Sequence, residues 1–136
     1  MISTNNINNI RPLAKGESWF GQVDIENNLC VFSEPKYATR AFYRLMRTYR
    51  KYYGANTIQE IFYRYAPPED GNDTEAYIEL VCDKTGIARD HEFEPTKENL
   101  IAICKASALM ENGHEAYAGI DEKIFEEGYD LYINSI

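Results

Sequence analysis

The sequence predicts a single α+β domain over residues 1–136, predominantly helical, with about five helices and one β-hairpin. Three observations support this class. Apolar residues recur at three- and four-residue spacing in several segments, which is typical of amphipathic helices. One pair of short segments rich in β-branched and aromatic residues is separated by turn residues. The 136 residues, 44% of them hydrophobic, are enough to bury one core.

The clearest helix is expected from Ser33 to Gly54. Ser33 can cap its first turn, Pro35 fits a position that needs no N–H partner, and Gly54 can take the left-handed conformation that ends a helix. An apolar stripe facing the core is formed by Ala38, Ala41, Phe42, Leu45, Tyr49, Tyr52 and Tyr53. Another face carries Arg40, Arg44, Arg47 and Lys51. We expect this basic face to be solvated and paired with acidic residues rather than to bind phosphate.

The remaining elements follow from caps, prolines and glycines. We expect the hairpin at Ser18 to Asp24 and Leu29 to Phe32, with its turn at Glu26-Asn27-Asn28. Four further helices are predicted at 57–65, from Asn72 or Asp73 through Thr85, at 96–110 and at 121–133. The asparagine-rich segment before the hairpin contains Ile7 and Ile10, so we expect it to be irregular but ordered.

Composition limits the function. The formal net charge is −8, and it is unevenly distributed. Residues 1–65 carry nine Lys/Arg against five Asp/Glu, whereas residues 66–136 carry five against seventeen. This balance argues against a nucleic-acid-binding domain. Seventeen Tyr and Phe residues with one Trp suit the binding of sugars, peptides or a protein partner.

Cysteines and apolar runs indicate the compartment. Cys30, Cys82 and Cys104 lie far apart in apolar runs without zinc-ligand spacing, so we expect reduced core residues. His91 and His114 are expected at the surface, and no metal or cofactor is expected. Without a signal peptide or an apolar run long enough to cross a bilayer, the protein is expected to be made in the cytoplasm.

A series of landmarks along the chain resembles a family of phage and prophage proteins labelled virion structural proteins. The landmarks, in order, are Asn5-Asn6, Asn9-Ile10-Arg11-Pro12, Trp19-x-Gly21, Arg40-Ala41, Thr57-Ile58, Tyr65-Ala66-Pro67-Pro68, Asn72-x-Thr74, Tyr77-Ile78-x-x-Val81 and Glu111-Asn112-Gly113. The family pattern has Pro-Gly at Ile7-Asn8 and Trp at Tyr65. The resemblance implies association with the virion and contact with other virion proteins.

A second resemblance concerns mechanism. The run from the paired asparagines through Trp19 to the long helix resembles lysozyme-like glucosaminidases, in which a catalytic glutamate precedes the asparagines and a hairpin forms the cleft wall. Here only Met1 to Thr4 precede them. The resemblance therefore implies a lysozyme-like fold, rearranged so that its acid lies elsewhere in the chain.

Glu111 is the candidate for that acid. It ends the most apolar predicted helix, where desolvation and the helix dipole would both raise its pKa. Glu17, Asp24 and Glu26, on or beside the hairpin, are the candidates for a second carboxylate. An ordinary helix end closed by Gly113 is the alternative interpretation.

The candidate substrate-binding residues are Asn5, Asn6, Asn9, Trp19 and Tyr65. The asparagines are implied by the resemblance, and the two rings could stack on sugars. The expected partner is peptidoglycan or another glycan strand. The chain is then a peptidoglycan glycosidase, a lytic transglycosylase or a wall binder. The alternative is a non-catalytic structural or host-interaction module on the same scaffold.

Overall fold

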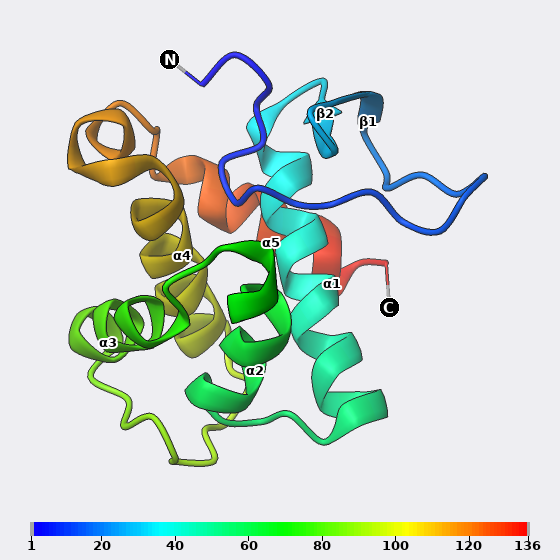
Figure 1. Ribbon diagram of the computed structural model, residues 1–136. Helices are drawn as coiled ribbons and strands as arrows, with labels where there is room; N and C mark the ends of the chain where they lie inside the picture. The colour runs from blue at the N-terminus through cyan, green and yellow to red at the C-terminus, as the bar shows by residue number, and fades with distance from the viewer. Residues whose placement is uncertain (1, 136) are drawn as a thin grey trace.

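The computed structural model describes residues 2–135 and has the predicted α+β architecture. A two-stranded antiparallel hairpin precedes five α-helices (Figure 1). The elements are β1 (Gln22–Glu26), β2 (Leu29–Phe32), α1 (Pro35–Tyr53), α2 (Ile58–Tyr65), a 3-10 turn η1 (Pro68–Asp70), α3 (Thr74–Thr85), α4 (Lys97–Ala118) and α5 (Lys123–Ile133). The number and order of elements agree with the sequence prediction.

Helix α1 is central to the packing and ends where predicted, at Gly54 in the left-handed region with φ of 64°. Its N-cap is Glu34, without a side-chain cap, so the prediction of Ser33 as cap is wrong. The predicted stripe is buried at its start, but Tyr52 and Tyr53 are 68% and 57% exposed. The last turn of α1 therefore extends beyond the core.

Helix α5 crosses α1 at very short distance. A Cβ atom added to Gly128 would lie 1.7 Å from Thr39 Oγ1 and 2.8 Å from the Lys36 carbonyl oxygen. The buried Tyr43 hydroxyl donates to the Phe125 carbonyl at 2.9 Å. Gly128 is therefore the residue that lets the last helix approach the central one.

The hairpin begins later than predicted. Its first strand is Gln22–Glu26 instead of Ser18 to Asp24, and an irregularity falls between Gln22 and Asp24. Asn27 and Asn28 form the turn, both with positive φ, which asparagine tolerates better than most residues. The residues from Ser18 to Gly21 belong instead to the irregular chain leading into β1.

Helix α4 is two helical segments joined at a kink. Gly113 has φ of 83° and ψ of 166°, which no helix contains. The prediction that Glu111-Asn112-Gly113 ends the apolar helix is right about the break, although the chain resumes a helical path to Ala118. Its N-cap, Thr96, accepts from the Asn99 N–H as predicted.

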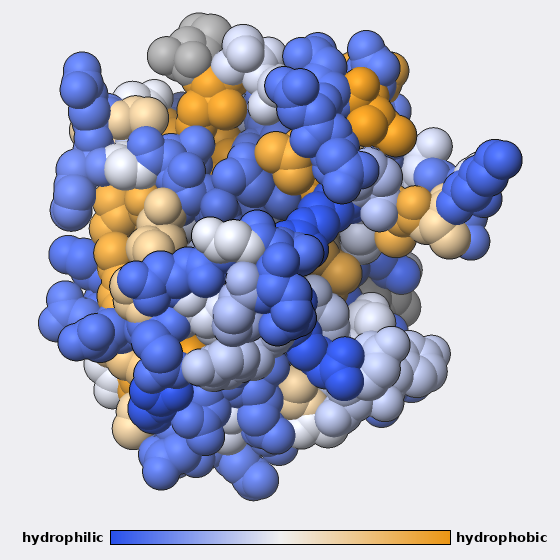
Figure 2. All heavy atoms as spheres, in the orientation of Figure 1, coloured by the Kyte–Doolittle hydropathy of each residue, from blue (hydrophilic) through white to orange (hydrophobic). Residues whose placement is uncertain are grey.

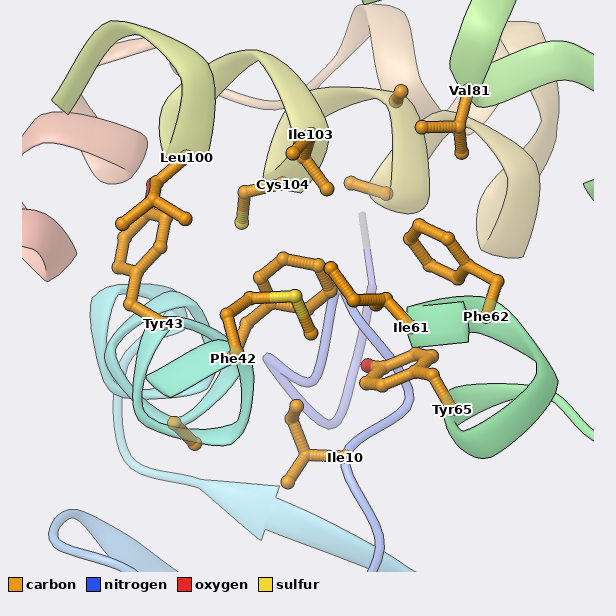
Figure 3. Packing of buried hydrophobic residues seen from close by; sticks show 14 of the residues in the cluster. Ile10, Phe42, Tyr43, Ile61, Phe62, Tyr65, Val81, Leu100, Ile103 and Cys104 are labelled. Carbon is orange, nitrogen blue, oxygen red and sulfur yellow. The ribbon is translucent and has the colours of Figure 1, made fainter. Parts of the chain in front are cut away.

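The core lies between α1, α2, α4 and the N-terminal segment. Figure 3 shows Ile10 of that segment pointing towards Phe42 of α1 and Tyr65 of α2, below Ile103 and Cys104 of α4. Ile7 and Ile10 are 2% and 0% exposed. The asparagine-rich segment is therefore an ordered part of the core, as predicted.

Cys30, Cys82 and Cys104 are free thiols. Cys30 and Cys104 are buried in the core as predicted, whereas Cys82 is only half-buried. Within residues 2–135, no cluster of three or more His, Cys, Asp or Glu residues is suited to hold a metal ion. None of the described helices is both long enough and apolar enough to cross a membrane. Polar residues dominate the face shown in Figure 2, and an apolar area lies on its left flank, over α4.

The basic face of α1 differs from expectation. Throughout residues 2–135, no Asp or Glu side chain lies within 4.0 Å of the charged groups of Arg40, Arg44, Arg47 or Lys51. Arg11, Lys36, Arg89, Lys97 and Lys105 do have such partners. The prediction that the ridge pairs with acidic side chains is therefore wrong.

Candidate functional site

The carboxylate of Glu111 is held at both oxygens. Its Oε1 accepts a hydrogen bond from Asn9 Nδ2 at 2.8 Å, and its Oε2 accepts one from the Tyr77 hydroxyl at 2.9 Å. The Tyr77 oxygen is also 2.6 Å from Ser107 Oγ, with either hydroxyl able to donate. Three distant parts of the chain, the N-terminal segment, α3 and α4, thus fix one half-buried acid.

Burial and the neighbouring polar groups shift the pKa of Glu111 in opposite directions. Burial raises the pKa of the Glu111 carboxyl, whereas the hydrogen bonds from Asn9 and Tyr77 and the charge of Arg11 lower it. Burial dominates, so the net direction is upward. A carboxyl in this setting retains its proton to a higher pH than an exposed glutamate, which is the property that a general acid requires.

The end of the apolar part of α4 is attached to the asparagine segment at several points. Asn112 Nδ2 donates to the carbonyl oxygens of Ile7 and Ala108, at 2.7 and 2.8 Å. Asn8 Nδ2 donates to the Cys104 carbonyl at 3.3 Å. The predicted acid and the predicted asparagine turn, about a hundred residues apart in sequence, therefore lie side by side.

Asn5 and Asn6 have structural contacts. Asn6 is 1% exposed and donates to the carbonyl oxygens of Ile10 and Cys30, at 2.9 and 2.8 Å. Its own oxygen accepts from the Ile10 N–H at 2.8 Å. Asn5 Nδ2 donates to the Phe32 carbonyl at 2.9 Å. Both side chains hold the segment against the hairpin, and Asn6 has no free donor left for a substrate.

Trp19 and Tyr65 border a small hollow next to Asn9, with a volume of about 140 Å³. Its wall consists of Asn9, Arg11, Pro12, Leu13, Trp19, Leu45, Tyr49, Arg64 and Tyr65. Trp19 Nε1 donates to the Arg11 carbonyl at 3.1 Å, and the buried Tyr65 hydroxyl donates to the Asn8 carbonyl. Trp19 is half-buried, whereas Tyr65 is part of the core.

The hairpin acids lie elsewhere. Glu17, Asp24 and Glu26 are exposed. Figure 1 shows the hairpin and the orange end of α4 on opposite sides of the N-terminal segment. The structure thus brings Glu111 together with Asn9, whereas Asp24 and Glu26 lie on β1, across the N-terminal segment from the end of α4 (Figure 1).

Tyr77, Ser107 and Arg11 influence Glu111 but were not predicted as site residues. Tyr77 and Ser107 face one another from α3 and α4, and only the packing of these helices reveals it. Tyr77 is 2% exposed. A sequence pattern can therefore show only that it is a core residue, not that its hydroxyl contacts an acid. Arg11, which is paired with Asp70 at 2.7 Å, was a landmark of the family pattern without an assigned role.

A hollow larger than the one beside Asn9 lies away from this site. It has a volume of about 780 Å³ and lies on the outer face of α4, beside Ile101, Ala102, Ala106 and Leu109. None of the predicted site residues lines it. Size alone therefore does not identify the candidate site, for which the arrangement around Glu111 is the stronger indicator.

The fold and the site define a small helical α+β protein with one half-buried glutamate set against an asparagine turn. Comparison with known proteins identifies its family. The chain is 38% identical over 133 residues to Protein P5 of Pseudoalteromonas phage PM2, an alignment covering 94% of this chain and 81% of the relative. The chain belongs to the family of this phage protein, which confirms the predicted relation to phage proteins. No family model matches the sequence.

Proposed function

We propose that this phage protein is associated with the virion and cleaves the glycan strands of bacterial peptidoglycan, with Glu111 as the general acid. The observation that carries the proposal is the hydrogen bond between Asn9 and Glu111. It places the acid beside the asparagine turn, the neighbourhood that lysozyme-like glucosaminidases give to a glutamate preceding the turn. In this chain the acid comes after the turn, from the last third of the sequence.

The chemistry needs a carboxyl that is protonated when substrate binds. Glu111 donates its proton to the glycosidic oxygen as the bond from that oxygen to the anomeric carbon breaks. The positively charged sugar is then captured by water, or by a hydroxyl of the same sugar. Glu111 recovers a proton from the incoming nucleophile. The raised pKa of Glu111 supports the first step.

Whether a second carboxylate is present decides between capture of the sugar by water and capture by its own hydroxyl. A hydrolase of the usual kind places a second carboxyl about 5–9.5 Å from the acid. Glu17, Asp24 and Glu26 remain candidates for this role only if substrate binding draws the hairpin towards Glu111. The hairpin and the end of α4 lie on opposite sides of the N-terminal segment (Figure 1), and this arrangement favours the single-acid route of a lytic transglycosylase, in which the sugar supplies its own nucleophile.

One observation favours a non-catalytic structural or host-interaction module instead. Both Glu111 oxygens are occupied by protein donors, Asn9 and Tyr77. A carboxylate with two satisfied oxygens can serve simply to join α3, α4 and the N-terminal segment. On that interpretation Glu111 stabilises the fold and has no substrate.

The two functions differ in the products they release. Purified peptidoglycan is incubated with wild type, Glu111→Gln and the matched control Glu115→Gln, which changes an exposed carboxylate on the same helix. Wild type and Glu115→Gln should release muropeptides, and Glu111→Gln should release none while keeping its melting temperature. Product ends lighter by one water, measured by mass spectrometry, would identify the transglycosylase route. A folded wild type that releases nothing from walls of several bacterial types contradicts the enzymatic proposal and leaves the structural module.

A further inference from the structure

A second, larger hollow adjoins the one at Asn9. It has a volume of about 580 Å³ and is lined by Leu13, Ser18, Trp19, Phe20, Arg40, Arg44, Thr48 and Ser135. Leu13 and Trp19 line both hollows, so the two adjoin at these residues. We call the two together the Trp19 groove. Asn9, the partner of Glu111, lines the first hollow, and Arg40 and Arg44 of the basic face of α1 line the second.

The far end of the groove has two positive charges close together. Arg40 and Arg44 are half-buried and one helical turn apart, a spacing at which like charges repel. Burial and the charge of Arg44 both lower the pKa of Arg40. Across residues 2–135 no acidic side chain lies within 4.0 Å of either guanidinium, although the chain carries 22 Asp and Glu. An anionic ligand would relieve this repulsion.

The walls of the groove suit a sugar. The Phe20 ring is 57% exposed, and the Arg40 guanidinium lies 5.1 Å from its centroid. Trp19 is half-buried and lines both hollows. Aromatic rings of this kind stack on the apolar faces of sugar rings, while the polar rim binds their substituents. A ligand that combines sugar rings with carboxylates would match both features.

We propose that the Trp19 groove binds the carboxylate-bearing part of a peptidoglycan strand, with Arg40 and Arg44 pairing with its lactyl or stem-peptide carboxylates. This inference rests on the proposed function, because it places the strand across Asn9 and Glu111. The groove thereby selects peptidoglycan over neutral chitin. Nucleic acid is the poorer match, because the net charge of −8 would repel a long polyanion outside the groove.

Binding of soluble peptidoglycan strands distinguishes this inference from catalysis. All proteins carry Glu111→Gln, which is the background, so that the strands stay intact. The ligands are native strands, strands whose carboxylates have been converted to amides, and chitin oligosaccharides. The groove variant carries both Arg40→Gln and Arg44→Gln. The control is Arg47→Gln with Lys51→Gln, which removes the same charge from α1 outside the lining of the groove.

The groove variant should lose affinity for native strands by about tenfold or more, the loss expected for charge-assisted hydrogen bonds. The control should bind as the background does, and amidated strands and chitin should bind all proteins weakly. Equal affinity of the background for native and amidated strands would overturn the inference. So would an unchanged affinity of the groove variant, or a single-stranded DNA or anionic vesicle that binds the groove more tightly than the strand does.

Failure of catalysis gives a different pattern. If wild type binds native strands through Arg40 and Arg44 but releases no muropeptide, the binding role of the groove is supported and the proposed glycan cleavage is contradicted. If wild type releases muropeptides and the groove variant does so equally well at limiting substrate, the proposed cleavage is supported and the binding role of the groove is contradicted.

Discussion

Replacing Asn6 by alanine should destabilise the whole domain. Asn6 is fully buried and makes three hydrogen bonds of 2.8 to 2.9 Å with the backbone of Ile10 and Cys30. The Ile10 carbonyl keeps a second partner, the Cys30 N–H at 3.0 Å. The Ile10 N–H makes no other hydrogen bond within residues 2–135, so it would remain buried and unpaired.

The expected cost follows from these contacts. An unpaired buried N–H costs about 1–3 kcal/mol, and each of the other two bonds contributes roughly 0.5–1.5 kcal/mol. Asn6→Ala should therefore lower the free energy of unfolding by about 2–6 kcal/mol. In urea, with a slope of about 1–3 kcal/mol per molar, the unfolding midpoint should fall by about 1 M or more.

Two further variants sharpen the measurement. Asn134→Ala removes an exposed asparagine at the end of α5 and should leave the midpoint nearly unchanged. Asn6→Asp keeps the shape but turns a second oxygen towards the carbonyls of Ile10 and Cys30, so at neutral pH it should be at least as harmful as alanine. Its buried carboxyl would have a raised pKa, so the loss should grow as pH rises. A midpoint for Asn6→Ala equal to that of Asn134→Ala would refute the argument.

Three further predictions concern other contacts. Gly128→Ala should cost about 1–3 kcal/mol, because the new methyl group would overlap Thr39, whereas Gly119→Ala meets its nearest atom at 3.5 Å and should be tolerated in thermal unfolding. Asp73→Ala should cost about 1 kcal/mol in urea unfolding, since its side chain caps α3 by accepting from a backbone N–H. Because the pKa of Glu111 is raised in the folded protein, the stability of wild type should decline as the pH rises from 4.5 through that pKa. The melting temperature of Glu111→Gln should therefore equal or exceed that of wild type at pH 7, and this difference should disappear in acid.

Local signals predicted the elements well where the chain supplies its own partner. Thr57 and Thr96 cap their helices by accepting from a backbone N–H three residues ahead, as the sequence pattern indicates. The prediction was wrong at Ser33, where Glu34 occupies the cap position instead. For α3 the sequence left Asn72 and Asp73 as alternative caps, and in the structure Asp73 provides the cap while Asn72 donates to the Pro67 carbonyl. Neighbouring residues of similar chemistry compete for one role, and tertiary contacts decide between them.

Only part of the candidate site could be predicted from local sequence patterns. The sequence indicates Glu111 and Asn9 as separate candidates. The structure joins them through a hydrogen bond between residues 102 positions apart in the chain. Tyr77 could not be found in this way, because nothing in a local pattern tells which core tyrosine turns its hydroxyl towards an acid. Long-range contacts of this kind depend on how whole helices pack.

The asparagine segment shows why stability and site are linked in this protein. Asn6 is fully used in holding Ile10 and Cys30, so its role is to fix the backbone path. That path leaves Asn9 in the left-handed region, with φ of 53°, and aims its amide at Glu111. A change at Asn6 should therefore disturb the acid indirectly, whereas a change at Asn9 should alter the pKa of Glu111 with a smaller effect on the fold. Because the hydrogen bond from Asn9 lowers that pKa, its removal should raise it further. Comparison of the two variants thus separates the residue that builds the site from the one that tunes its acid.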